Sequence, residues 1–279
     1  MTRHLRWQIL LILIGVALVG LFLTYLALNY TTVLRPGRGG TYVEGIAGFP
    51  RYLNPLLSRY GEVDRDVCAL LFNGLTRLNE RGEVEADLAR SWEVTLDGLM
   101  YTFYLRPNVY WHDGAPLTAD DVVFTVGLLQ DPAFPGPPEL GATLWRAVKV
   151  EKVDRYTVRF TLPGPYAYAP FLDYTTFGIL PTHLLSGTRA ADLPDAAFNL
   201  SPVGSGPFKL ADMNVESGVV TSLVLEQFPY YYGATPYLDR IQFRFYPSSQ
   251  VVLDAYEADE VEGIGSIPIA DLPRARALT

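Results

Sequence analysis

Twenty consecutive residues near the amino terminus, Ile9 to Leu28, carry no charged side chain. At 1.5 Å per residue, a helix of this length matches the hydrocarbon core of a bilayer, which is about 30 Å thick. Arg3 and Arg6 precede the run and favour a cytoplasmic amino terminus, although two arginines also follow it. We therefore predict that residues 1–30 form an uncleaved transmembrane anchor. A cleaved secretory signal is the alternative, but the small residues that a cleavage site needs fit poorly here.

The segment after this run is short and rich in glycine and proline. Residues 31–40 (TTVLRPGRGG) predict a flexible linker, and we expect everything after it to lie outside the cytoplasm. Cys68 is the sole cysteine, so no internal disulfide can form. It falls in Glu62–Leu71, where apolar residues follow helical spacing. We interpret Cys68 as a small buried hydrophobe rather than a reactive thiol.

Composition narrows the class of protein. Hydrophobic residues make up 49% of the 279 residues and charged residues 19%, which excludes a disordered chain. The net charge is −8, and after the first 30 residues the 20 remaining basic side chains face all 30 acidic ones. Nucleic-acid binders present a basic surface, so this acidic body argues against a nucleic-acid partner.

The body has the pattern of a mixed α/β domain. Alternating apolar residues flank Asp97-Gly98 and Asp154-Arg155, and both patterns predict β-hairpins. In the first hairpin we expect Leu96 to share a face with Trp92 and Val94. Thr118, followed three residues later by an acid, predicts a capped helix start. Two further segments, Val219–Glu226 and Ile241–Tyr246, are strand-like. Ser201–Phe208, which precedes them, is a glycine-rich loop.

No catalytic constellation emerges from the sequence. His112 adjoins Asp113, but no second histidine lies at metal-ligand spacing, so a turn histidine is the preferred interpretation. The glycine loop Val203–Phe208 lacks the Gly-Lys-Ser/Thr ending of a phosphate-binding loop and the Gly-x-Ser-x-Gly pattern of a nucleophile elbow. We expect no enzyme activity, no cofactor and no metal site.

An ordered set of short segments is far more specific than any of these single features. The segments are Pro50–Leu56, Leu71–Leu78, Ala86–Val94, Tyr101–Pro107, Trp111–Phe124, Ser201–Phe208 and Pro236–Phe243. In this order they closely resemble the extracytoplasmic solute-binding proteins of family 5, the peptide-, nickel- and oligopeptide-binding subunits of ABC importers. Departures are small, such as Gly204-Ser205-Gly206 where Gly-Thr-Gly is commoner in the family, and Glu260-Val-Glu262 where Gly-Glu-Val-Asp is frequent.

The resemblance implies a periplasmic-binding-protein-like class II fold, with two mixed α/β lobes that close on a solute. Mapped onto this chain, residues 40–73 and 184–262 would form the first lobe and residues 74–183 an inserted subdomain. Residues 263–279 would begin the second lobe. Family members continue well beyond this point, so we expect the chain to correspond to an amino-terminal portion, either a fragment or a genuine short protein.

The resemblance also implies a function. The chain would capture a peptide, or a related solute such as nickel or a sugar, and deliver it to ABC permease subunits in the membrane. A membrane-anchored sensor that acts with a signalling partner is one alternative, and a truncated non-functional copy is another. The sequence does not identify the solute or the oligomeric state.

Candidate ligand-binding residues come from loops that approach the ligand in family members. Arg59 could pair with a solute carboxylate, and tyrosines could line an apolar pocket with hydroxyl groups at its wall. The competing interpretations are that Arg59 is a solvated charge and that the tyrosines pack over a turn at Gly233. The candidates are Ser58, Arg59, Tyr60, Gly61, Tyr231, Tyr232, Ile264, Gly265 and Ser266.

Overall fold

The computed structural model of the chain describes residues 2–30, 37–136, 145–164 and 171–278. The chain divides into two compact units, Met1–Arg38 and Gly39–Thr279, and each is described by itself. Most of the predicted linker, residues 31–36, lies outside the described residues. The backbone amide of Gly39 donates to the carbonyl of Tyr237 (2.7 Å), so Gly39 already belongs to the second unit.

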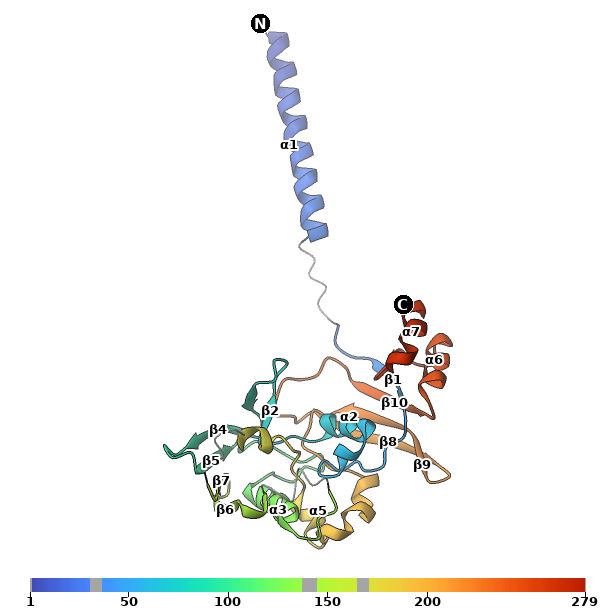
Figure 1. Cartoon of the computed structure of the whole chain (residues 1–279). Helices are drawn as coiled ribbons and strands as arrows, with labels where there is room; N and C mark the ends of the chain where they lie inside the picture. Colours follow the sequence, from blue (N-terminus) through green and yellow to red (C-terminus); the bar gives the residue numbers. More distant parts are fainter. Residues whose placement is uncertain (1, 31–36, 137–144, 165–170, 279) are drawn as a thin grey trace. The chain divides into compact units, whose positions relative to one another are not determined.

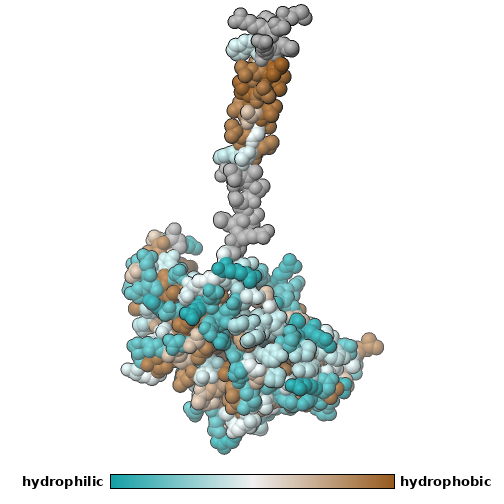
Figure 2. All heavy atoms as spheres, turned by 180° about the vertical axis from the view of Figure 1, so that it is seen from behind, coloured by the Kyte–Doolittle hydropathy of each residue, from teal (hydrophilic) through white to brown (hydrophobic). Residues whose placement is uncertain are grey.

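The first unit contains one long helix, α1 (Thr2–Tyr30). Within it, Trp7–Leu26 has a mean hydropathy of 2.8, and no other described helix is long and apolar enough to cross a membrane. The Thr24 hydroxyl donates to the Gly20 carbonyl (2.8 Å), which satisfies this polar group within the helix. The apolar side chains of α1 are exposed along the helix, and Figure 2 shows this apolar surface. The face of the second unit seen in the same figure is mostly polar.

A five-stranded mixed sheet organises one part of the second unit (Figure 1). Strand β1 pairs in parallel with β10 and β11, and β10, β9 and β8 follow as an antiparallel series. The sheet therefore joins segments about 200 residues apart in the sequence. In spatial order its strands are β11 (Gly263–Ile264), β1 (Thr41–Ala47), β10 (Arg240–Tyr246), β9 (Val219–Gln227) and β8 (Phe208–Glu216).

The two faces of this sheet pack differently. On one face Ile46 and Phe243 are buried in the core. On the other, helix α6 (Ser249–Glu257) lies so close to β1 that a Cβ at Gly45 would be 3.0 Å from Val252. Glycine at position 45 thus permits this helix to approach the strand.

A second, antiparallel sheet is built from the two predicted hairpins, in the order β4-β5-β7-β6 (Figure 1). Their existence is confirmed, and Gly98 has the positive φ (+69°) that the turn between β4 and β5 requires. The expectation for Leu96 is wrong: it lies in the turn and is fully exposed, because the strand ends at Val94. The strands are β4 (Ala89–Val94), β5 (Met100–Leu105), β6 (Lys149–Asp154) and β7 (Thr157–Thr161).

Helix α3 (Ala119–Gln130) begins with the predicted capping box. The Thr118 hydroxyl accepts from the Asp120 amide (3.3 Å), and the Asp121 carboxylate accepts from the Thr118 amide (2.8 Å). Asp121 also accepts from the backbone amide of Thr182 (2.9 Å), so one buried carboxylate caps α3 and holds the start of a second helix.

Replacing the cap hydroxyl tests this helix start. Thr118→Ala removes an acceptor from the first turn, and we expect it to lower the free energy of unfolding by about 1 kcal/mol. Urea denaturation of the purified chain measures this loss. Thr118→Ser keeps the acceptor and should restore most of the stability, whereas equal losses in both variants would contradict the capping role.

Short elements connect the sheets. A hairpin of β2 (Thr76–Leu78) and β3 (Val84–Ala86) forms a two-stranded sheet of its own. Helix α2 (Glu62–Leu71) spans the segment predicted to be helical, with Cys68 buried as expected. The remaining helices are η1 (Ser58–Tyr60), η2 (Trp145–Ala147), η3 (Phe171–Thr175), α5 (Thr182–Leu185), η4 (Ala190–Asp195), η5 (Ala197–Leu200), η6 (Ile269–Asp271) and α7 (Leu272–Leu278).

His112 binds the glycine loop Ser201–Phe208, which in turn binds the end of α2. It lies in a turn, as predicted; its Nδ1 accepts from the Gly204 amide and its Nε2 donates to the Gly206 carbonyl, both at 3.1 Å. The Gly206 amide in turn donates to the carbonyl of Leu71, the last residue of α2 (2.8 Å). These bonds require a neutral imidazole, and burial lowers the pKa of His112 to about 4.

Candidate functional site

The predicted residues Ile264, Gly265 and Ser266 lie where the parallel strands β1 and β11 end. The Gly265 amide donates to the Gly45 carbonyl (3.1 Å), which extends the pairing of β11 with β1 by one bond. A Cβ at Gly265 would be 2.7 Å from a Glu44 carboxylate oxygen, so a larger residue here would require the Glu44 side chain to move away. Ligands of open α/β sheets bind outside the carboxyl ends of such strands.

The Glu44 carboxylate lies beside this position, and Asp66 on α2 is near enough to act on it electrostatically. Glu44 on β1 is half-buried, and its pKa is raised by burial and, to a smaller extent, by the charge of Asp66 on α2. Helix α2 thus brings its own carboxylate toward the same edge of the sheet. We call Glu44, Asp66 and Ile264–Ser266 the β1 edge.

Glu44 was not among the residues predicted for the site. Its signal in the sequence is a single charged residue in an otherwise uncharged strand, Thr41–Ala47. Such a residue also occurs on any half-exposed strand, so the signal becomes specific only once β11 is known to pair with β1.

Ser58, Arg59, Tyr60 and Gly61 lead into α2. The Asp64 carboxylate in its first turn accepts the amides of Arg51 and Tyr52, both at 2.7 Å, and ties the helix to the loop that follows β1. Asp64 is almost completely buried, and burial raises its pKa more than these two hydrogen bonds lower it. Since Gly61 has no side chain, this carboxylate can lie directly beside it.

Three of these four residues, all except Gly61, line two separate hollows. Ser58 and Arg59 line one of about 190 Å³, which we call the Arg59 hollow. The Ser58 hydroxyl donates to the Pro55 carbonyl (3.2 Å), and among the described residues Arg59 forms no ion pair. Tyr60 lines the other, of about 380 Å³, and its hydroxyl donates to the Pro135 carbonyl (2.6 Å).

The Arg59 hollow also contains Arg65 and Cys68. Burial raises the pKa of the Cys68 thiol well above its ordinary value, so the thiol stays protonated and is a poor nucleophile. Arg65 lies near two acidic neighbours, Glu62 (3.9 Å) and Asp66 (3.8 Å). Arg59 is therefore the cation of this hollow that is available to a bound anion.

The predicted Tyr231 and Tyr232 lie elsewhere. They line a hollow of about 510 Å³ that shares no residue with the Arg59 hollow. The Tyr232 hydroxyl donates to the buried Asp87 carboxylate, and a Cβ at Gly233 would lie 2.6 Å from the Tyr231 ring. These contacts are the ones expected if the tyrosines pack over a turn at Gly233.

The candidate site thus combines carboxylates at the β1 edge with Arg59, which lies in η1 just before α2. Such an arrangement suits a solute that carries both positive and negative groups. Among the described residues, no three His, Cys, Asp or Glu side chains gather as metal ligands.

Comparison with known proteins identifies the family. Residues 83–278 match the model of the bacterial extracellular solute-binding proteins, family 5 (middle region). The chain belongs to this family. The matched range includes Tyr231, Tyr232 and Ile264–Ser266, whereas Ser58–Gly61 precede it.

Individual relatives agree with this family 5 assignment. The chain is 33% identical over 245 residues to the oligopeptide-binding protein AppA of Bacillus subtilis, covering 86% of this chain and 43% of AppA. It is 30% identical over 278 residues to a dipeptide-binding protein of Escherichia coli, covering 90% of this chain and 49% of the relative. The chain therefore spans about half the length of the curated relatives it matches.

The structure of B. subtilis AppA in complex with a nonapeptide superimposes with a TM-score of 0.75 and 31% identity. The superposition covers 88% of this chain and 47% of AppA. The expected mixed α/β fold of family 5 is confirmed over this part of the relatives.

Proposed function

We propose that this chain is part of an extracytoplasmic solute-binding component of an ABC importer that captures peptides and delivers them to membrane permease subunits. The observation that carries the proposal is the likeness to AppA, both in sequence and in fold, over nearly nine-tenths of this chain. We infer that the bound solute leaves without chemical turnover. Residues 1–30 would anchor the protein in the membrane with the body outside the cytoplasm.

We further propose a division of the body that corresponds to family 5. Residues 40–73 and 184–262 would form the first lobe, 74–183 the inserted subdomain, and 263–279 the start of the second lobe. In support, strands β1, β8, β9 and β10 of the five-stranded sheet all fall within the residues assigned to the first lobe. The four-stranded sheet lies entirely within the residues assigned to the inserted subdomain. Strand β11 pairs with β1, which would place the β1 edge beside the hinge of a closing clamp.

The solute would lie across the β1 edge and the Arg59 hollow. Glu44 and Asp66 would attract its ammonium group and Arg59 its carboxylate, through charge-assisted hydrogen bonds. Ser58, Gly61 and Ile264–Ser266 would shape the surrounding surface, whereas Tyr60 lines a separate hollow and stays a prediction. Tyr231 and Tyr232 stay a prediction as solute contacts, since they line a different hollow.

Peptide titration tests the proposal. We expect the full chain in detergent micelles to bind members of a nonapeptide pool in isothermal titration calorimetry. Arg59→Gln should weaken binding about tenfold, because a hydrogen bond to a charged group is lost. Arg90→Gln, which removes an exposed arginine on β4, is the matched control and should bind as the unmodified chain does.

Two outcomes would contradict the proposal. In one, no peptide of the pool binds although the chain is folded by circular dichroism. In the other, mass spectrometry detects cleavage of a bound peptide. If peptides bind but Arg59→Gln leaves the affinity unchanged, the function stands and the placement of the solute at Arg59 is wrong.

A further inference from the structure

A group of buried and charged side chains outside the β1 edge surrounds the hollow that contains Tyr231 and Tyr232. Four segments of the chain meet there: the β2–β3 hairpin with the residue directly after it, the residue after β5, the residue before β8, and the loop before β10. Its volume of about 510 Å³ is within the range of small-molecule sites. We call it the Arg106 hollow; it is lined by Arg77, Ala86, Asp87, Arg106, Pro207, Tyr231, Tyr232, Gly233, Ala234 and Pro236.

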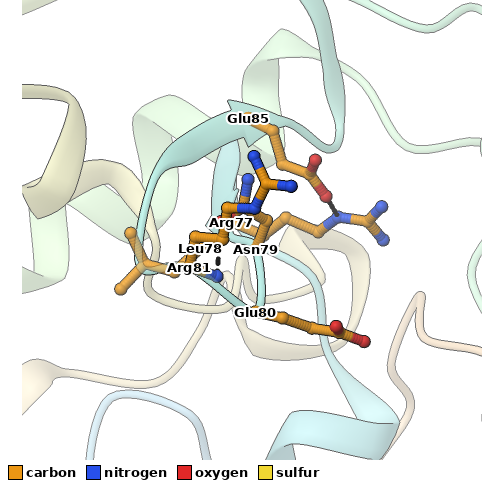
Figure 3. Close-up of a pocket in the computed structure, with 6 residues that line it drawn as sticks. All are labelled: Arg77, Leu78, Asn79, Glu80, Arg81 and Glu85. Atoms are coloured by element: carbon orange, nitrogen blue, oxygen red, sulfur yellow. Dashed lines mark hydrogen bonds and ion pairs between the residues drawn. The ribbon is translucent and has the colours of Figure 1, made fainter.

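Two arginines line this hollow, and each donates a hydrogen bond through its Nε atom. The Nε of Arg106 donates to the backbone carbonyl of Asp87 (2.8 Å), and its guanidinium lies 5.5 Å from the centre of the Tyr232 ring. The Nε of Arg77 donates to the Glu85 carboxylate (2.6 Å) across the β2–β3 hairpin, as Figure 3 shows. The terminal amino groups of both arginines have no hydrogen-bond partner among the described residues.

The carboxylate that lines this hollow, Asp87, already accepts hydrogen bonds from neighbouring side chains. Asp87 is 3% exposed and accepts from the Tyr232 hydroxyl and from the Asn73 amide (3.0 Å). Burial raises its pKa, so its negative charge is disfavoured there. Glu85 offsets the charge of Arg77, but Arg106 forms no ion pair within the described part of the chain.

The remaining walls are apolar or neutral. Pro207, Pro236, Ala234 and the ring of Tyr231 offer apolar surface for methylene groups. Each guanidinium has a planar pair of terminal donors, and this geometry fits the two oxygens of a carboxylate.

We propose that the Arg106 hollow binds a small carboxylate, with Arg77 and Arg106 holding its oxygens and the prolines and Tyr231 covering its carbon chain. This would be a second binding site, separate from the β1 edge. The proposal does not depend on the peptide-binding function, because none of its residues lines the Arg59 hollow.

Succinate titrated into the full chain in detergent micelles at pH 7 tests the site. We expect saturable, millimolar binding in isothermal titration calorimetry, and no binding of the uncharged analogue succinamide. Arg77→Gln and Arg106→Gln should each weaken succinate binding about tenfold. Arg81→Gln is the matched control, because Arg81 lies on the same hairpin but outside the Arg106 hollow.

Several results of these titrations would contradict the proposed carboxylate site. Wild-type affinity in both Arg77→Gln and Arg106→Gln, absent binding, or equal binding of succinamide would overturn the proposal. Equally tight, arginine-dependent binding of inorganic phosphate would overturn the assignment to carboxylates. Should Arg106→Gln fail to fold after losing its bond to Asp87, Arg77→Gln decides, because the Arg77 side chain is 55% exposed and has little role in packing.

Discussion

Gly204→Ala should leave little cooperatively folded protein. A Cβ at this position would lie 1.7 Å from the carbonyl oxygen of Leu71, which ends α2, and 3.1 Å from the His112 ring. Backbone surrounds it, so the clash cannot be relieved by rotating a flexible side chain. We expect the free energy of unfolding to fall by about 4 kcal/mol or more, in the upper range of single substitutions. Urea denaturation followed by tryptophan fluorescence measures the loss.

Gly127→Ala provides the control for this substitution. Gly127 lies within α3, and a Cβ there would have no neighbour within 4 Å. Because alanine favours the helix over glycine, this variant should be more stable by about 0.5–1 kcal/mol. A Gly204→Ala protein with a normal urea transition would show that the loop 201–207 moves freely and would refute its close packing on α2.

Acidification should destabilise the protein through His112. Its pKa falls from 6.5 in the unfolded chain to about 4 in the folded state, chiefly because the ring is buried. The unfolded state therefore binds the proton more readily, and the stability present above pH 6.5 is lost as the pH falls through 4. The difference in pKa corresponds to about 3 kcal/mol between these limits.

Comparison with His112→Gln isolates this contribution. A glutamine amide can donate to the Gly206 carbonyl and accept from the Gly204 amide, but it does not titrate. The control is needed because burial raises the pKa of Glu44, Asp64 and Asp87, and these groups favour the folded state as the pH falls. Urea denaturation at pH 7 and pH 4.5 should give a steeper loss for the unmodified chain. Parallel pH profiles would contradict the role of His112.

Local patterns predicted the elements that local interactions stabilise. The helix Glu62–Leu71, the capping box at Thr118 and the turn at Asp97-Gly98 all depend on contacts within a few residues. Leu96 shows the limit of the same reasoning. An alternating pattern continues through the sequence into the turn, but the chain reverses after Thr95, whose amide makes a last hydrogen bond to Met100 of the partner strand (3.0 Å).

The candidate site was only partly predictable. Glycine at position 265 is readable in the sequence, but its reason, the approach of the Glu44 carboxylate, arises only when β11 pairs with β1. Arg106 and Tyr232 are likewise 126 positions apart in the sequence and meet as guanidinium and ring. Neither has a local pattern that indicates the other.

The sequence by itself determined an apolar helix, the hairpins, the family and the acidic net charge. Each follows from side-chain chemistry or from residues close together in the chain. Only the tertiary structure decided the order of the strands, the separation of Tyr231 and Tyr232 from the β1 edge, and the neutral state of His112. These features depend on contacts between segments that are distant in the sequence. The free energies of strand pairing and of burying a titratable group arise only after the chain has brought those segments together.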